Sequence, residues 1–135
     1  MALTVNTLGN SMGIVNIQTF FFTTDSTAAV KTHFHCGFLP RIVKFINLTD
    51  RVTDEWVLGM AADSALHTVA NGDRTYVTSG GITAVEGSDV TLASSVVMPG
   101  TLVLAPASGS QPVTGFSIPA ALMVASKSFA VVATA

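Results

Sequence analysis

The stretch FLPRIVKFINLTDRVTDEWVLGM, residues 38–60, decides the fold. It holds two runs of strand-forming residues, at about 38–47 and 54–60, on either side of the polar sequence Leu48-Thr49-Asp50-Arg51. Two such runs around a short polar segment are typical of a β-hairpin. We therefore predict a hairpin in which Trp56 is the main core side chain of the returning strand.

The first strand of this hairpin is predicted to lie inside a sheet and not at its edge. Successive side chains of a strand point to opposite faces, so Ile42, Lys44 and Ile46 share one face, and Val43 and Phe45 share the other. Both faces are largely apolar, which favours a central position in the sheet.

The rest of the chain reads as all-β. Val, Ile, Thr and Phe are abundant, and glycine or proline recurs at the spacing of short strands, with Asn71-Gly72 as a two-residue turn signal and Gly80-Gly81 as a further turn. Strands are also expected at 64–70, 75–78, 82–85, 89–93, 102–104, 115–118 and 128–135, a flexible loop at 105–115 and one weak helical candidate at 119–125. The predicted fold is a compact antiparallel β-sandwich or barrel with an extended N-terminal arm.

Residues 1–30 differ in pattern from the remainder of the chain and are predicted to form an arm or a first strand, while 31–135 form a single β domain. The segment carries apolar side chains that are unlike the surface of an isolated protein. Such a segment can add a strand to the sheet edge of a neighbour. The predicted partner-contact residues are Ile14, Ile17, Phe20, Phe21 and Phe22.

Composition favours a contact protein over an enzyme. Asp, Glu, Lys and Arg make up 10% of the 135 residues, against about 25% in an average domain. Surfaces so poor in charge are often covered by other subunits, so we expect a homo-oligomer. A net charge of −2 without a basic cluster argues against nucleic acid, and no apolar run is long enough for a membrane helix. A secretory signal is not expected, and the single cysteine fits a reducing cytosol.

The segment Thr32-His33-Phe34-His35-Cys36 is the one candidate for chemistry. On a strand, His33 and His35 point to the same side and could share a metal, while Cys36 points away. The third histidine, His67, is distant in sequence. We favour the simpler interpretation of hydrogen-bonding or partly buried histidines and a small buried cysteine, and we expect no catalytic residues, no metal site and no cofactor.

The chain resembles small virion accessory proteins of tailed bacteriophages, a group that includes capsid decoration, or cement, proteins. The resemblance covers roughly residues 37–135 and consists of a pattern of strand-forming residues. Its parts are Gly37-Phe38-Leu39-Pro40-Arg41, a strand ending at Asn47, Glu55-Trp56, Gly59-Met60, Gly115-Phe116-Ser117-Ile118 and the final FAVVATA.

This resemblance implies a structural virion protein that binds over junctions of major capsid subunits and stabilises the head. It implies a location on the capsid surface after synthesis in the host cytoplasm, with the major capsid protein and other copies of the chain as partners and a trimer favoured. Two alternatives stay open. One is another phage virion component, such as a tail, head-fibre or adaptor protein. The other is a non-viral β-sandwich binding module, or a metal-dependent enzyme that uses His33 and His35.

Overall fold

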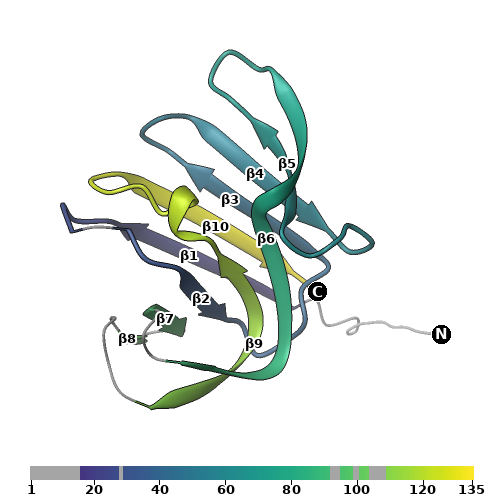
Figure 1. Ribbon diagram of the computed structural model, residues 1–135, viewed down its shortest axis with the longest axis vertical. Coiled ribbons are helices and arrows are strands. Elements are labelled where there is room, and N and C mark those ends of the chain that lie inside the picture. Colours follow the sequence, from purple (N-terminus) through teal and green to yellow (C-terminus); the bar gives the residue numbers. More distant parts are fainter. Residues whose placement is uncertain (1–15, 28, 92–94, 99–100, 104–108) are drawn as a thin grey trace.

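The computed structural model describes residues 16–27, 29–91, 95–98, 101–103 and 109–135. The strands in these residues form one mixed sheet in the order β1-β10-β3-β4-β5-β6-β9-β2-β7-β8 (Figure 1). The all-β prediction is therefore confirmed. The elements are β1 (Ile17–Thr23), β2 (Thr32–His35), β3 (Ile42–Asn47), β4 (Val52–Val57), β5 (Ser64–Thr68), β6 (Arg74–Thr91), β7 (Ser95–Met98), β8 (Thr101–Val103), β9 (Ser110–Ile118), the short 3₁₀ helix η1 (Ala120–Leu122) and β10 (Ser128–Thr134).

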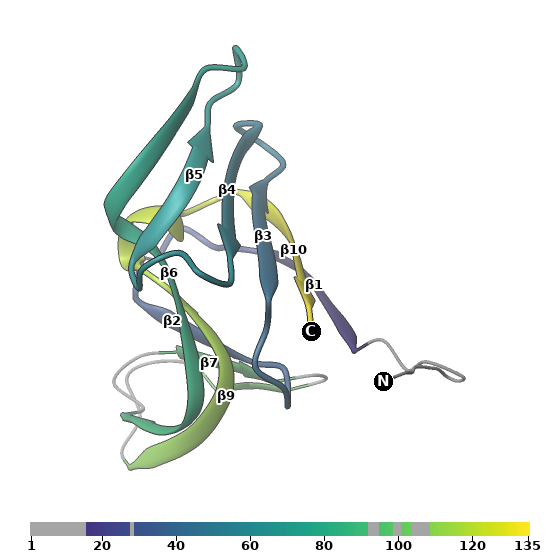
Figure 2. The same cartoon turned by 90° about the vertical axis from the view of Figure 1, so that its right-hand side faces the viewer.

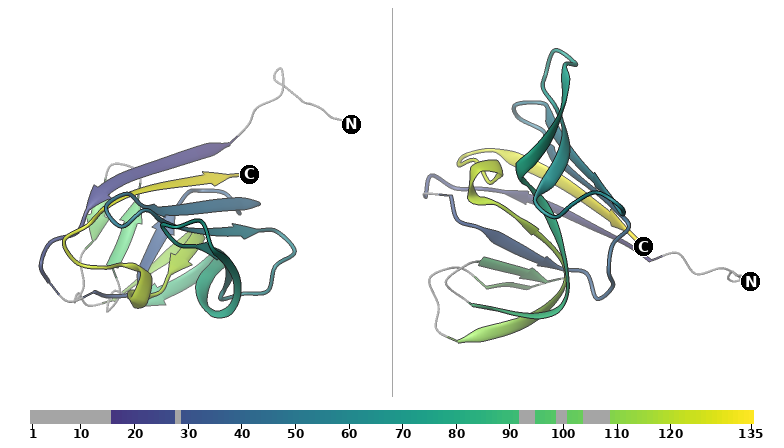
Figure 3. Two further views of the ribbon diagram at one scale, coloured as in Figure 1. Left: turned by 90° about the horizontal axis from the view of Figure 1, so that it is seen from above. Right: turned by 45° about the vertical axis from the view of Figure 1, so that its right-hand side comes forward.

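The sheet curls into a half-barrel, so that one half packs against the other (Figure 2). Strands β1, β10, β3, β4 and β5 make up the first half, and β9, β2, β7 and β8 the second, as the views in Figure 3 also show. Curling lets a single sheet bury one of its faces without a second sheet.

Phenylalanine rings fill much of the space between the halves. Phe20 of β1 meets Phe34 of β2 edge-on, with ring centroids 5.2 Å apart, and Phe34 stacks on Phe116 of β9 at 4.9 Å. Phe129 of β10 tilts against Phe45 of β3 at 5.1 Å. Such ring pairs add roughly 0.5–1.5 kcal/mol each beyond the area they bury, so this cluster joins strands that are far apart in sequence.

The predicted hairpin of residues 38–60 is present as β3 and β4, which pair antiparallel with Val43 opposite Trp56. Trp56 is buried, and its indole N–H donates a hydrogen bond to the carbonyl oxygen of Ala61 (3.3 Å). The central position of β3 in the sheet is confirmed, because β10 and β4 flank it. Only one face of β3 is covered within the described residues: Ile42 and Lys44 on the other face are exposed, because nothing in the described chain packs on that side.

Strand β6 runs through a corner of the sheet where the sequence predicted a break at Gly80-Gly81. Its first part pairs with β5 and its second part with β9. Gly80 has a φ of 75°, and a Cβ on Gly81 would collide with the backbone of Ser64 in β5. The two glycines therefore form a bend inside one strand. The separate strands predicted at 75–78 and 82–85 are parts of β6, as are residues 89–91 of the strand predicted at 89–93, whose last two residues lie outside the described residues.

The prediction of a purely antiparallel fold needs one correction. β2 pairs antiparallel with β9 but parallel with β7, so the sheet is mixed. At the β2–β9 contact, a Cβ on Gly115 would fall on the carbonyl oxygen of Phe34. Only glycine allows the backbones to come so close there.

Two loop predictions also change. The 64–78 hairpin exists, but Val69 and Asp73 are joined by their backbones around Ala70-Asn71-Gly72, and only Gly72 has positive φ, at 94°. This is the three-residue loop, not the two-residue turn. Residues 110–115 of the predicted flexible loop belong to β9, and 104–108 lie outside the described residues. The helical candidate at 119–125 is the short helix η1.

Candidate functional site

The most extensive candidate site is the outer face of the first half of the sheet, on the side opposite the phenylalanine core. Cross-strand registers align its side chains in rows that run from β1 across β10, β3 and β4. We call these residues the outer face. The first row is Ile17, Thr134, Ile42 and Val57; the second is Thr19, Val132, Lys44 and Glu55; the third is Phe21, Ala130, Ile46 and Thr53.

The outer face is apolar and hydroxyl-rich, with little charge. Ile17 is 57% exposed and Phe21 75% exposed, and Ile42 and Val57 are also open to solvent. The two charges in these rows neutralise each other, since Lys44 Nζ lies 3.9 Å from Glu55 Oε2. A face with exposed large apolar side chains and no net charge is suited to contact with another protein surface.

The predicted contact residues of the N-terminal segment divide between the two faces of β1. Phe20 is buried at 7% exposure, and Phe22 packs partly buried against the core. Their rings hold β1 to the domain and are not offered to a partner. Ile17 and Phe21 point outward and belong to the outer face. Ile14 lies outside the described residues.

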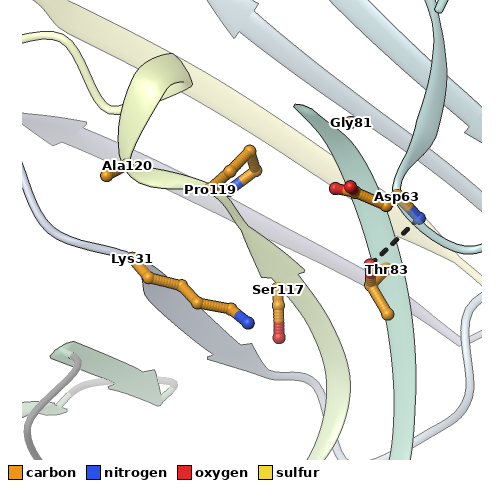
Figure 4. Close-up of a pocket in the computed structure, with 7 residues that line it drawn as sticks. All are labelled: Lys31, Asp63, Gly81, Thr83, Ser117, Pro119 and Ala120. Atoms are coloured by element: carbon orange, nitrogen blue, oxygen red, sulfur yellow. Dashed lines mark hydrogen bonds between the residues drawn. The ribbon is translucent and has the colours of Figure 1, made fainter. Parts of the chain in front are cut away.

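A hollow of about 140 Å³ lies beside Ser117 of β9 and is lined by Lys31, Asp63, Gly81, Thr83, Ser117, Pro119 and Ala120 (Figure 4). His33 Nδ1 lies 2.6 Å from the hydroxyl of Ser117, the residue opposite it on β9. Burial, and then the nearby charge of Lys31, lower the pKa of His33, so its imidazole is held neutral. Lys31 and Asp63 place opposite charges at different sides of this hollow (Figure 4).

His35 and Cys36 have their own local roles. The backbone N–H of Thr114 donates to His35 Nδ1 at 3.1 Å, and the N–H of Cys36 donates to the Thr114 carbonyl at 2.9 Å. Burial raises the pKa of the Cys36 thiol to about 12, which leaves it protonated and a poor nucleophile. Within the described residues, no group of three or more His, Cys, Asp or Glu side chains is placed to hold a metal ion.

A second histidine pair joins β4 and β5. His67 Nδ1 lies 2.7 Å from Asp54 Oδ1, directly across the strand pairing. Asp54 is only 3% exposed, and burial raises the pKa of its carboxyl, against the opposing effect of the hydrogen bond and charge of His67. A carboxylate can orient an imidazole in this way for catalysis, but no hydroxyl or thiol in the described chain is hydrogen-bonded to His67.

Sequence reasoning missed most of the outer face and the Asp54–His67 pair. Lys44 was the available signal for the outer face, because a lone cation in the middle of a strand face indicates that this face meets solvent. The Asp54–His67 contact depends on the register between β4 and β5, and the sequence between these strands does not fix that register, although Gly59 indicates a turn there.

Comparisons of the chain with protein-family models, with curated proteins and with solved structures found no match. None of the helical segments in the described residues has the length and apolar character needed to cross a membrane.

Proposed function

We propose that the chain is a structural virion protein of a tailed bacteriophage, a capsid decoration or cement protein that stabilises the head. The outer face is the observation that carries this proposal. It offers exposed apolar side chains on a continuous sheet, and its one Lys–Glu pair leaves it without net charge. The resemblance of residues 37–135 to virion accessory proteins supports the same role.

The mechanism is adhesive. Each copy lies over a junction between major capsid subunits and buries its outer face on more than one of them. A stable contact needs about 800 Å² from each partner. At about 25 cal/mol per Å², that area gives roughly 20 kcal/mol before the cost of association, which removes much of it. Repetition over many equivalent positions on the shell then strengthens binding through avidity.

A shell-binding experiment tests the proposal. Purified protein is added to capsids that lack it, and both the bound amount and the resistance of the capsids to heat are measured. We expect saturable binding and a higher disruption temperature. Capsids that neither bind the protein nor gain heat resistance contradict the proposal. Electron microscopy that locates the protein on the tail supports the other virion role instead.

Two matched variants connect the result to the outer face. Ile42→Lys places a charge in the first row of this face, between Thr134 and Val57. Leu48→Lys places the same charge on another exposed apolar residue, in the turn between β3 and β4. We expect Ile42→Lys to weaken capsid binding by about tenfold or more, because a charge is desolvated in an apolar contact, and Leu48→Lys to leave it unchanged.

A further inference from the structure

Strand β1 has one free edge in the described part of the chain, and its hydrogen-bonding pattern can be derived. The N–H of Ala135 donates to the carbonyl oxygen of Asn16, and the N–H of Thr24 donates to that of Lys127, both at 2.9 Å. In an antiparallel ladder, hydrogen-bonded pairs recur at every second residue. The even-numbered residues of β1 therefore bond to β10. The odd-numbered residues direct their N–H and C=O groups to the open edge: Ile17, Thr19, Phe21 and Thr23.

This edge lacks the features that usually prevent strands from pairing with other chains. Natural edge strands carry lysine, proline or a bulge that blocks pairing. β1 reads IQTFFFT, without a charge or a proline, and pairs with β10 in continuous register. The carbonyl oxygen of Thr19 accepts a bond from the Gln18 side chain at 3.2 Å, which an incoming strand would join or displace. Within the described residues, no other strand pairs with this edge along the seven residues of β1.

We propose that the β1 edge pairs with β1 of a second copy of this chain, antiparallel about a two-fold axis that passes beside Phe20. In this register Thr19 of each copy is opposite Phe21 of the other, and Ile17 is opposite Thr23. Every odd-numbered N–H then meets a carbonyl oxygen, and the two sheets become one. The pairing covers Phe21, the most exposed large apolar side chain in the described chain, on both copies.

Three observations favour a second copy over other occupants of the edge. Two-fold pairing joins surfaces that are identical, so one strand supplies both sides of the contact. The strand is uncharged, so two copies meet without like-charge repulsion. The opposite edge strand, β8, has three residues in the described part of the chain, which is too short to match the seven of β1 in a head-to-tail ring.

The proposed dimer differs from the trimer that the resemblance to virion proteins favoured. The dimer also does not depend on capsid binding. A closed trimer needs two different surfaces in each contact, whereas β1–β1 pairing uses one surface twice. The two ideas therefore fail separately, because the dimer is measured with the purified chain alone.

The first measurement is the mass in solution by analytical ultracentrifugation, from about 1 µM to about 1 mM, a range that covers weak and moderate dissociation constants. We expect a concentration-dependent rise from 13.9 kDa to twice that value. Hydrogen exchange followed residue by residue gives the register. We expect the amides of Thr19 and Phe21 to gain protection as the dimer forms, and those of Phe20 and Phe22 to be protected throughout.

Two double variants test the register itself. Thr19→Lys with Phe21→Lys sets two cations opposite each other on both sides of the axis, and should weaken the dimer by about tenfold or more. Thr19→Glu with Phe21→Lys sets opposite charges across the same positions, and should bring the dissociation constant back to within about threefold of the wild type. Residues 19 and 21 are both on the exposed face of β1, so neither double variant should disturb the folding of the monomer. The circular dichroism spectrum of each monomer is the control.

Other outcomes overturn the proposal. A trimer, a monomer at every concentration, or a dimer that both double variants leave unchanged excludes pairing through this edge. Protection of Thr19 and Phe21 at all concentrations in a monomer means that another segment of the same chain covers β1. Weakening of the dimer by both double variants alike excludes the register about Phe20.

Discussion

The inner and outer faces of β1, β10, β3 and β4 are built from similar residue types but have different surroundings. On β1, Phe20 packs into the core while its neighbour Phe21 is 75% exposed. On β4, Trp56 is buried while the adjacent Val57 is open to solvent. Hydrophobicity alone therefore does not distinguish a side chain that stabilises the domain from one that awaits a partner; the alternation along each strand and the curl of the sheet decide it.

Trp56→Ala should have the largest effect on this comparison. Removing the indole leaves a cavity beside Val43, so we expect the free energy of unfolding to fall by about 3–5 kcal/mol. Val57→Ala, one residue away on the outer face, should change it by about 0.5 kcal/mol or less. Urea unfolding followed by far-ultraviolet circular dichroism measures both, and similar midpoints for the two variants would contradict the placement of Trp56.

Phe20→Ala and Phe21→Ala make the same comparison at the edge of the sheet. We expect Phe20→Ala to lower the free energy of unfolding by about 3 kcal/mol, because the ring of Phe20 contacts Phe34 and Phe116. The loss is at the lower end for such a change because an edge strand can partly relax into the cavity. Phe21→Ala should cost about 0.5 kcal/mol or less in the monomer. Both are measured by urea unfolding at low protein concentration, where association does not contribute. Equal losses would mean that Phe21 also packs within the monomer.

Gly115→Ala tests how closely the second half of the sheet is packed. The added methyl group would fall on the Phe34 carbonyl oxygen, so β2 and β9 must separate, at a cost of about 1–3 kcal/mol. Gly72→Ala is the comparison, since Gly72 has open space around it and positive φ, and only backbone strain of about 1 kcal/mol is expected. Thermal unfolding ranks the two. A smaller loss for Gly115→Ala would show that β2 and β9 do not pack closely at this position.

The pH dependence of stability should give the smallest effect. The folded-state pKa of His33 is below its ordinary value of 6.5, so below that pH the unfolded chain takes up a proton that the folded chain does not. Stability from this group is present above pH 6.5 and is lost as the pH falls through the window below it. We expect the wild type to lose more stability than His33→Gln between pH 7 and pH 5, as measured by urea unfolding at each pH.

Asp54 contributes to the pH dependence of stability with the opposite sign to His33. The effect of His33 must therefore be measured as the difference between the wild type and His33→Gln. The folded-state pKa of Asp54 is raised above 3.8, so the folded chain holds the proton more tightly and stability falls as the pH rises through that window. Asp54 is present in both proteins, and its contribution cancels in the difference. Equal pH profiles for the wild type and His33→Gln would show that the imidazole is not held neutral by burial.

The sequence predicts local structure well and contacts between distant segments poorly. The β3–β4 hairpin could be predicted because two alternating strands flank a short polar turn. The pairing of β1 with β10 could not, because it joins residues more than a hundred positions apart. Which of Phe20, Phe21 and Phe22 points inward depends on that pairing, and all three are equally apolar. From the sequence, Gly80-Gly81 predicts a turn between two strands. Glycine pairs also occur at bends inside one strand, as in β6, and the sequence does not distinguish the two cases.

Strand β6 has a consequence for how the domain unfolds. Its 18 residues contribute hydrogen bonds to β5 in one half of the sheet and to β9 in the other. Neither half can melt while the other keeps its native backbone, since the same strand would have to be ordered and disordered at once near Gly81. Denaturation is therefore expected to be a single cooperative transition, with spectroscopic probes in β4 and in β2 reporting the same midpoint.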